Sequence, residues 1–264
     1  MTSAAKKTGL RFSLMTVNVR FGLADIGGPH DWDARKQAFI PLLTARRPDF
    51  IAMQEVNPFQ AAYFQSLLPD YGVIGERSPA PAFWQDVLIF YHRQWRCVKQ
   101  DRFFLSQTPD VPSRMADSRW PRQCVMGRFR REGHDITCAN THFDFADHVQ
   151  RESARIILNR LSNFSPDPTP QLLAGDFNAS PGAGCHRLLT EPGDLTTDPF
   201  DDVFADAHAG TVHKFTGRPV GDQVDWILWR HHLEVTGKAV ITDNVDGIYP
   251  SDHFPVYAAF ACHL

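Results

Sequence analysis

Residues 172–181, with the sequence LLAGDFNASP, constrain the fold more than any other part of this chain. A short apolar run leads to Gly175, and a Pro-Gly turn follows, so the pattern predicts a buried strand that ends here. In α/β sheets, ligands bind at the carboxyl ends of strands. Because side chains alternate along a strand, we expect Asp176 and Asn178 on one side and Phe177 packed on the other. An acid and an amide could then share one water molecule.

The same residues have a simpler interpretation. Asp and Asn beside Gly and Pro are common in turns, where their side chains bond to their own backbone. A second motif favours a site, because Ser251-Asp252-His253 precedes an apolar run over residues 254–260 that is typical of a strand. An adjacent acid and histidine at the mouth of a strand could serve metal binding and phosphate contact, although such a pair is also common in surface turns.

Four further apolar segments predict strands that carry an unusual polar residue. They are residues 11–19 with Asn18, residues 49–56 with Glu55, residues 134–142 with His142, and residues 223–229 with Asp225. Asp225 is the sharpest anomaly, because it lies inside an otherwise hydrophobic strand. A buried carboxylate without a partner is costly, so we expect Asp225 to be paired, and histidine is a natural partner. Glu55 could instead be a solvated loop acid, and His142 a structural histidine.

In their order along the chain, these segments resemble the endonuclease/exonuclease/phosphatase superfamily. Its members are metal-dependent phosphoesterases and include DNase I-like nucleases, deadenylases, inositol polyphosphate 5-phosphatases and neutral sphingomyelinases. The matching motifs are TVNVRFG, DFIAMQEV, NTHFD, GDFNASP, VDWILW and SDHFPV, which span residues 11–260. The GDFN and SDH elements are each moderately specific, and the ordered set is strongly so. Further similarity to a mostly uncharacterised bacterial branch lies in FFLSQTPDVPS, RWPRQCVMGRF and GTVHKFTG.

The resemblance implies a metal site and a water-activating group. Glu55 would be the main ligand of Mg²⁺ or Mn²⁺, with Asn18 and Asp252 beside it, and hard oxygen ligands suit such ions. Asp176 would orient and deprotonate the attacking water, and Asn178 would fix the direction of that water. In-line attack on a phosphate needs both an aimed water and a cation that neutralises the developing charge.

The resemblance also implies a set of phosphate contacts. His142 and Arg122 would hold phosphoryl oxygens. His253, oriented by Asp225, would contact the phosphate as negative charge grows in the transition state. Whether Asp176 or His253 is the general base stays open at this point. Arg122 lies in a proline-containing loop, where an arginine can also be simply solvated.

Two positions depart from the family's pattern. Phe145 follows Asp144 where many relatives have a second histidine, so a second histidine contact is not carried over. Trp226 replaces the more usual tyrosine or histidine after Asp225. We expect this change to leave the metal site intact and to alter the wall of the pocket.

Predicted strands alternate with predicted helices at residues 34–46 and 148–161, the second of which is amphipathic. Pro41 predicts a kink or a late start of the first helix. The pattern indicates an α/β fold in which two mixed β-sheets pack face to face with helices outside, which is also the family's four-layer, DNase I-like sandwich. No low-complexity linker divides the 264 residues, so we expect a flexible N-terminus over residues 1–9 and one catalytic domain over residues 10–264.

The net charge and the positions of arginine and aromatic residues limit the classes of substrate that we expect. A net charge of −3 argues against a protein that grips long duplex DNA, but it allows a small phosphorylated substrate or a short single strand. Arginines cluster over residues 114–131, either as a phosphate-facing patch or as charges that guard an exposed strand edge. Four aromatic residues lie near the expected site and could stack on a base or pack in the core. They are Trp84, Trp120, Phe215 and Trp226.

The five cysteines show no CxxC pair and no spacing suited to zinc, and we expect reduced thiols. The first fourteen residues contain two lysines but no apolar signal region, and no stretch approaches a membrane span. We therefore expect a cytoplasmic monomer without membrane insertion and without an obligate protein partner.

The sequence as a whole predicts a metal-dependent phosphoesterase that hydrolyses a phosphodiester, in nucleic acid or a nucleotide, by direct attack of water. No serine or cysteine in the motifs has a neighbouring base arranged for attack, so we expect no covalent intermediate. Two other enzymes remain as alternatives: a phosphomonoesterase acting on a sugar or inositol phosphate, and a sphingomyelinase-like phospholipase. An inactive relative that binds a phosphorylated partner is the non-enzymatic alternative.

Overall fold

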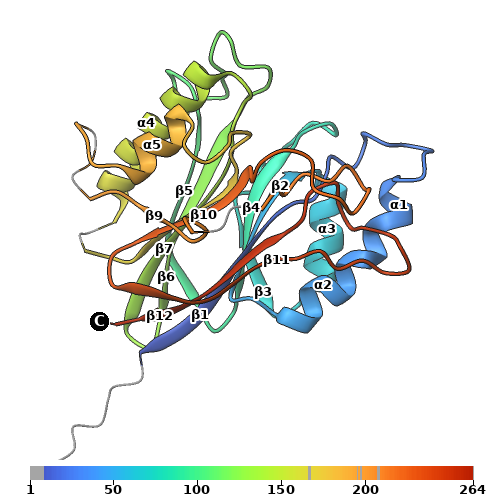
Figure 1. The fold of residues 1–264 in the computed structure, drawn as a ribbon, viewed down its shortest axis with the longest axis horizontal. Coiled ribbons are helices and arrows are strands. Elements are labelled where there is room, and N and C mark those ends of the chain that lie inside the picture. The colour runs from blue at the N-terminus through green and yellow to red at the C-terminus, as the bar shows by residue number, and fades with distance from the viewer. Residues whose placement is uncertain (1–8, 166–167, 195, 197, 207–208, 264) are drawn as a thin grey trace, which may run out of the picture.

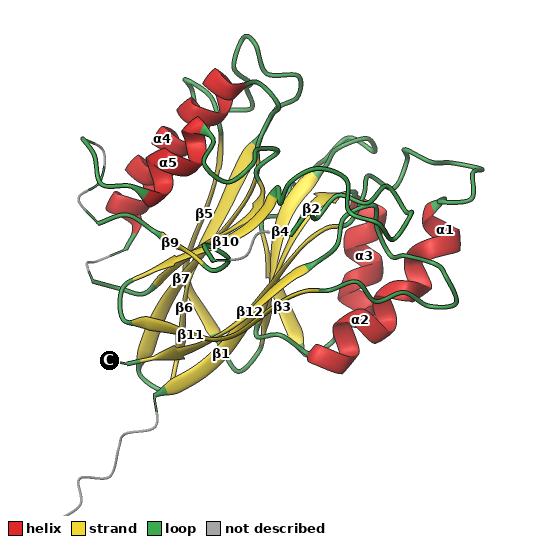
Figure 2. Cartoon of the chain, in the orientation of Figure 1, coloured by secondary structure: helices red, strands yellow, loops and turns green. Residues whose placement is uncertain are grey.

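A computed structural model of the chain describes residues 9–165, 168–194, 196, 198–206 and 209–263. Within these ranges, two six-stranded mixed sheets pack face to face, and helices lie on their outer sides (Figures 1 and 2). The predicted four-layer α/β architecture is therefore confirmed. The N-terminus that we expected to be flexible lies outside the described residues, apart from Gly9.

The first sheet joins strands from both ends of the chain, in the order β11-β12-β1-β2-β4-β3. Its strands are β1 (Leu10–Asn18), β2 (Phe50–Val56), β3 (Tyr71–Ile74), β4 (Asp86–His92), β11 (Leu233–Val240) and β12 (Val256–Cys262). β1 and β2 run parallel, whereas β12 runs antiparallel to β1. The start of β12 therefore lies at the same edge of the sheet as the ends of β1 and β2.

The second sheet has the order β5-β6-β7-β8-β10-β9. Its strands are β5 (Arg96–Phe104), β6 (Gln123–Arg131), β7 (His134–His142), β8 (Gln171–Asp176), β9 (Asp201–Asp202) and β10 (Asp225–Arg230). β7 and β8 run parallel, and β10 runs antiparallel to β8 with Asp225 opposite Asp176. The start of β10 therefore lies beside the ends of β7 and β8.

The helices divide between the two outer faces (Figure 1). α1 (Trp32–Arg35), α2 (Phe39–Arg46) and α3 (Pro58–Leu67) accompany the first sheet, and α4 (Asp147–Phe164) and α5 (Gly184–Thr190) accompany the second. A 3₁₀ turn at Lys36–Ala38 separates α1 from α2. Pro41 lies in the first turn of α2, where a backbone N–H has no intrahelical acceptor, so the predicted late start is confirmed. Among the described helices, none has both the length and the apolar character that a membrane crossing needs.

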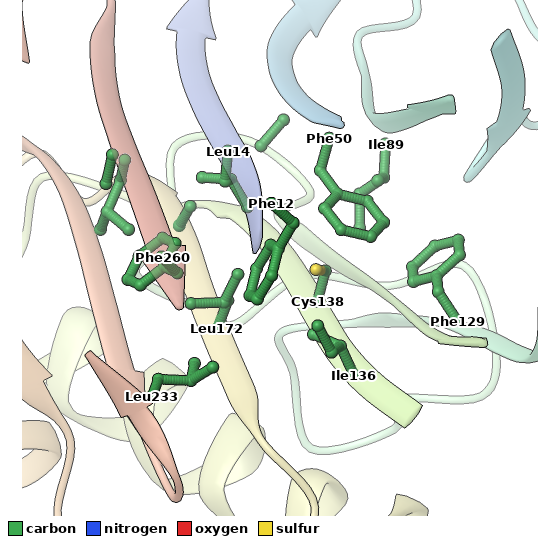
Figure 3. Close-up of a cluster of buried hydrophobic side chains, with 14 of the residues drawn as sticks. Phe12, Leu14, Phe50, Ile89, Phe129, Ile136, Cys138, Leu172, Leu233 and Phe260 are labelled. Atoms are coloured by element: carbon green, nitrogen blue, oxygen red, sulfur yellow. The ribbon is translucent and has the colours of Figure 1, made fainter. Parts of the chain in front are cut away.

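Aromatic and branched side chains fill the space between the sheets (Figure 3). Phe12, Phe50 and Phe260 extend from the first sheet, and Phe129 and Leu172 extend from the second. Two further apolar clusters pack the helices against the outer faces. Because such interiors are close-packed, this core fixes the edges of the two sheets relative to each other. Cys97, Cys124, Cys138 and Cys185 are free thiols.

Candidate active site

The polar residues at the strand termini meet at one end of the packed sheets. Asn18, His142 and Asp176 end their strands, whereas Asp225 starts β10 and His253 precedes β12. Antiparallel pairing brings strand starts beside strand ends, which is why residues so distant in sequence converge. A cavity of about 740 Å³ opens at this end of the sheets. Its lining includes seven of the nine predicted site residues: Glu55, Arg122, His142, Asp176, Asn178, Asp252 and His253.

Asp225 and His253 form the predicted pair across the gap between the sheets. Nδ1 of His253 donates to Oδ2 of Asp225 at 2.9 Å. Burial alone would lower the pKa of His253, but the charge and the hydrogen bond of Asp225 raise it well above the ordinary value. Asp225 is the first residue of β10, so the strand begins two residues later than predicted. The imidazole is therefore held by a carboxylate and favours its charged form.

Asp176 lies between the two histidines. Its Oδ2 accepts a hydrogen bond from Nδ2 of Asn18 at 3.0 Å and lies 3.9 Å from Nδ1 of His253 and 3.5 Å from Nε2 of His142. Burial, followed by the nearby carboxylate of Asp225, raises the pKa of Asp176. Asp176 is therefore a more basic carboxylate than an exposed one.

Asn178 combines the two interpretations of the GDFNASP motif. Its backbone N–H donates to Oδ1 of Asp176 at 2.9 Å, as the turn interpretation predicts, and its φ of 48° does not continue the strand. The strand ends at Asp176, yet both side chains line the cavity. Phe177 packs in the apolar cluster between the second sheet and helices α4 and α5, on the side predicted for it. Strand alternation therefore explains Phe177, and the turn explains Asn178.

The amide of Asn178 fixes the state of His142. Nδ2 of Asn178 donates to the carbonyl of Phe143 at 2.9 Å and lies 3.1 Å from Nε2 of His142. Since a carbonyl only accepts, the amide nitrogen must face it, and Nε2 of His142 must then be an acceptor. Burial, together with the charges of Arg122 and His253, lowers the pKa of His142 well below the ordinary value. His142 is therefore a neutral imidazole protonated on Nδ1.

Arg122 is buried beside the cavity, so the interpretation as a simply solvated loop residue was wrong. Its side chain is 7% exposed, and Nε lies 3.5 Å from Oδ2 of Asp144. The same oxygen accepts from the hydroxyl of Ser118 at 3.0 Å and from the backbone of Arg119 at 2.9 Å. The sequence patterns predicted no role for Asp144, although its position two residues after His142, a predicted site residue, indicated that it lies near the site. Asp144 thus anchors the loop that carries Arg122.

Glu55 and Asn18 form a second polar group on the first sheet. Nδ2 of Asn18 donates to Oε1 of Glu55 at 3.0 Å, and the backbone of Phe21 donates to Oε2 of Glu55 at 2.7 Å. Glu55 has a φ of 61°, a left-handed conformation that is uncommon for a residue other than glycine and is often found at functional sites. Its carboxylate is therefore held in place by both its bonds and its backbone.

Asp252 is paired with an arginine that the sequence reasoning missed. Nη1 of Arg20 donates to Oδ2 of Asp252 at 3.1 Å, and the same guanidinium binds Asp25 through Nε at 2.9 Å. The signal for Arg20 was its position two residues after Asn18 in TVNVRFG. The guanidinium of Arg20 thus neutralises part of the negative charge of Asp25 and Asp252.

The oxygen atoms of Glu55, Asn18 and Asp252 fit a hard divalent cation. They are carboxylate and amide oxygens, which Mg²⁺ and Mn²⁺ prefer. The carboxylates of Glu55, Asp176 and Asp252 line the same cavity, so a cation bound among them would be stabilised. Among the described residues, Asp176, Asp225 and His253 also lie close enough to share an ion. His253 and Asp225 are already bonded to each other, and this argues for the oxygen set as the metal site.

Aromatic side chains form one wall of the cavity. Phe83, Trp120 and Phe145 are 69%, 55% and 58% exposed, and Trp84 lies beside them. Exposed aromatic groups around a cavity are typical of a ligand site rather than of a core. The rings provide flat apolar surface beside the polar groups described above.

Two of the four aromatic residues expected near the site have other roles. Trp226 is buried and stacks on Phe177 at 4.3 Å, and Phe215 stacks on His30 at 4.0 Å. The expectation that Trp226 alters the pocket wall was wrong, because side chains alternate along β10. Asp225 faces the gap between the sheets, and Trp226 faces the apolar cluster between the second sheet and helices α4 and α5.

The arginines of residues 114–131 do not form one patch. Arg128 and Arg130 pair with Asp135 at 3.8 and 2.5 Å, and Arg131 pairs with Asp49 at 2.9 Å. All three lie on β6, which is flanked by β5 and β7, so they do not guard an exposed edge either. Of this cluster, Arg119 and Arg122 line the cavity.

Comparisons with known proteins agree with this geometry. The sequence model of the Endonuclease/Exonuclease/phosphatase family matches residues 15–253. A solved endonuclease/exonuclease/phosphatase family protein from Bacteroides thetaiotaomicron is 25% identical, with a TM-score of 0.86 over 97% of this chain and 99% of that one. A mannosyl-6-phosphatase from Bacteroides thetaiotaomicron is 25% identical, with a TM-score of 0.84 over 95% of this chain and 99% of that one. An uncharacterized protein of Acanthamoeba polyphaga mimivirus is 28% identical to part of this chain. The matched part covers 56% of this chain and 60% of the viral protein's length.

Proposed function

Because this chain belongs to the endonuclease/exonuclease/phosphatase family, whose members are phosphoesterase hydrolases, we propose that it hydrolyses a phosphodiester in a nucleotide or a short nucleic acid. One observation carries the proposal. Asp176, a buried carboxylate of raised pKa, lies within 4 Å of two histidines that favour opposite charge states. Such a site offers a proton acceptor and positive charge side by side.

Asp176 is the general base in this proposal. Its raised pKa makes it a better proton acceptor than an exposed carboxylate, whereas His253 already favours the charged form. Asp176 takes the proton of a water molecule as that water attacks phosphorus in line. Asn178, bonded through its backbone to Asp176, limits the direction of that water. The water oxygen bonds to phosphorus as the bond from phosphorus to the leaving ester oxygen breaks, and the leaving oxygen takes a proton from solvent. No covalent bond to the protein forms.

Three side chains stabilise the phosphoryl group in this proposal. Arg122 and His253 supply positive charge, and His142 supplies the N–H on Nδ1. Preorganised donors of this kind contribute most where charge develops in the transition state. A Mg²⁺ or Mn²⁺ ion held by Glu55, Asn18 and Asp252 would supply Lewis-acid polarisation and further charge neutralisation when bound.

The aromatic wall supports a nucleotide as the substrate. Phe83, Trp120 and Phe145 present exposed rings beside the phosphoryl-binding groups. Stacking of a base on an aromatic side chain is worth about 1–3 kcal/mol, and this surface would otherwise stay in contact with water. The net charge of −3 favours a short substrate over long duplex DNA.

A sugar phosphate is the second candidate substrate. The mannosyl-6-phosphatase from Bacteroides thetaiotaomicron resembles almost the whole chain at 25% identity. In this case the reaction is phosphomonoester hydrolysis, with the same base and the same phosphoryl contacts. The aromatic wall would then pack against the apolar face of a sugar ring.

The deciding experiment is a Mg²⁺-dependent screen of the purified protein. Substrates are bis-p-nitrophenyl phosphate, short RNA and DNA, mannose 6-phosphate, inositol phosphates and sphingomyelin. We expect the highest kcat/KM on a phosphodiester, and loss of turnover both in EDTA and in Glu55→Gln. Fastest hydrolysis of mannose 6-phosphate would establish the second candidate. Binding without turnover of any substrate would establish an inactive phosphate-binding relative.

We also propose that the protein acts as a monomer in the cytoplasm. The free thiols of Cys97, Cys124, Cys138 and Cys185 support a reducing compartment. Light scattering of the purified protein tests the monomer, and fractionation of the source cells tests the compartment.

A further inference from the structure

The hydrogen bond between Asp225 and His253 joins two separate sheets. Asp225 starts β10 of the second sheet, and His253 precedes β12 of the first. Strand pairing therefore does not set the distance of 2.9 Å between their side chains. The core packs the two sheets together, and a segment that bonds to both strand starts can further fix them relative to each other.

The segment at residues 210–217, GTVHKFTG, contacts the loop that carries His253. The backbone N–H of Phe254 donates to the carbonyl of Thr211 at 2.7 Å. The N–H groups of His213 and Lys214 donate to the carbonyl of Asp252 at 2.8 and 3.0 Å. These hydrogen bonds therefore hold the backbone of Asp252 and of Phe254, the residues on either side of His253.

The same segment contacts the start of β10. Oγ1 of Thr211 accepts from the backbone N–H of Val224 at 3.1 Å and from that of Asp225 at 3.3 Å. Thr211 is fully buried, so water does not compete for these bonds. One residue thus bonds to the backbone of Asp225 on one sheet and to the backbone beside His253 on the other.

We infer that Thr211 is a positioning residue that holds Asp225 and His253 at hydrogen-bonding distance across the two sheets. Its hydroxyl fixes the backbone of Asp225, and its carbonyl fixes the backbone of Phe254. The catalytic consequence rests on the proposed phosphoesterase function, whereas the geometric consequence does not. This assignment gives a role to the GTVHKFTG motif, which the site residues leave unexplained.

Further contacts hold residues 213–217 of this segment in place, and this fixes the position of Thr211. The ring of His213 stacks on Phe254 with centroids 3.9 Å apart, and its Nδ1 accepts from the backbone of Gly217 at 3.2 Å. Lys214 and Phe215 have φ values of 50° and 62°. Consecutive left-handed residues other than glycine persist only where the surroundings hold them. The segment is therefore a rigid brace between the sheets.

Thr211→Val tests the hydroxyl, because valine keeps the shape of the side chain and loses the acceptor. We expect kcat to fall about 10- to 100-fold with KM within about two-fold, since a small misplacement of a catalytic pair has effects of this order. Thr211→Ser restores the acceptor and should restore kcat. Thr137→Val is the matched control, because Thr137 is also buried and bonds through its hydroxyl to Ser165, away from the site.

A double-mutant cycle separates positioning from general stability. If Thr211 acts through the pair, Thr211→Val should cost little further kcat in an Asp225→Asn background. Independent losses that multiply would overturn the inference, as would a kcat of Thr211→Val equal to that of Thr137→Val. Failure of Thr211→Ser to restore kcat would also overturn it.

Proton NMR of the metal-free protein tests the geometry without any substrate. The hydrogen-bonded Nδ1–H of His253, assigned by its loss in His253→Gln, should shift or broaden in Thr211→Val and remain unchanged in Thr137→Val. Thr211→Ala gives a second variant if valine does not fit. An unchanged resonance in the folded Thr211 variants would overturn the inference. A protein without phosphoesterase activity but with the expected NMR change would overturn the proposed function alone.

Discussion

The two histidines of the cavity differ in their partners and therefore in their charge. His253, from the first sheet, donates to the carboxylate of Asp225, which raises its pKa well above the ordinary value. His142, from the second sheet, accepts from the amide of Asn178, and burial with nearby positive charge lowers its pKa well below that value. Both rings are largely buried and line the same cavity.

The comparison shows that burial alone does not decide the state of a histidine. Desolvation favours the neutral form in both cases. Asp225 outweighs it at His253, whereas Arg122 and His253 reinforce it at His142. One cavity thus holds a cationic and a neutral imidazole, each with a ring nitrogen within 4 Å of the same carboxylate, Asp176.

The largest effect should follow from removing the carboxylate that both histidines face. Asp176→Asn should lower kcat by about 10²- to 10⁴-fold, the usual range for general-base assistance. Metal binding should survive, because the proposed ligands lie on other strand ends. Steady-state kinetics and Mn²⁺ titration measure the two effects. Near-normal kcat in this variant would rule out Asp176 as the base.

Asp176→Asn should also stabilise the metal-free protein at high pH. The folded-state pKa of Asp176 is raised, so the folded state binds this proton more tightly than the unfolded state, and stability is lost as pH rises through that pKa. Asparagine removes this loss, which should raise the free energy of unfolding by about 1–2 kcal/mol at pH 8. Urea unfolding at pH 8 and pH 4 measures it, and an equal gain at both pH values would contradict the explanation.

Asp225→Asn should remove the difference between the two histidines. Without the carboxylate, burial dominates at His253, so its pKa should fall. Loss of a charged donor to the transition state costs about 10²- to 10³-fold in kcat. NMR titration of both histidines in the metal-free protein is the measurement. A His253 that stays charged in this variant would show that Asp225 is not the cause.

Arg122→Gln should act on the other histidine. Removing this charge should raise the pKa of His142, because Arg122 is one of the groups that lower it, and should leave His253 charged. A hydrogen bond to a charged group contributes about 1.5–3 kcal/mol, so KM should rise about 10-fold or more. If KM does not change, Arg122 makes no contact with the substrate.

The smallest effect concerns stability against pH in the metal-free protein. The depressed pKa of His142 means that stability is lost as pH falls below the ordinary value of 6.5. The raised pKa of His253 means that its contribution is present below 6.5 and is lost as pH rises through the folded-state pKa. His142→Gln and His253→Gln should therefore change the slope of stability against pH in opposite directions, each by up to about 1.4 kcal/mol per pH unit. Urea unfolding between pH 5 and 8 measures both slopes, and slopes that change in the same direction would contradict the pKa assignments.

Local pattern was enough to predict several of the residues that reach the cavity. Asp176 follows a short apolar run, and a run of this kind forms a strand whose end faces solvent or a ligand. The partner of Asp225 followed from the cost of a buried charge, and the structure confirms His253 in that role. Phe177 was placed correctly by the two-residue period of a strand.

Pattern failed where position depends on neighbours from other elements. Trp226 is a different case, because strand alternation already sends it to the side opposite Asp225. Arg128 could be read as an exposed edge charge until the sheet order placed β6 between two strands. Arg20, Asp144 and Thr211 were missed because their importance lies in partners 13 or more residues away.

The sequence by itself determined the kinds of group that meet in the cavity, because strand pattern and turn residues are local properties. It determined the fold for the same reason, through the order of strands and helices. Only the tertiary structure decided the charge of each group. Asp225, Asn178 and Arg122 set the states of His253 and His142 from other strands and loops, and electrostatic interactions depend on distance in space rather than along the chain.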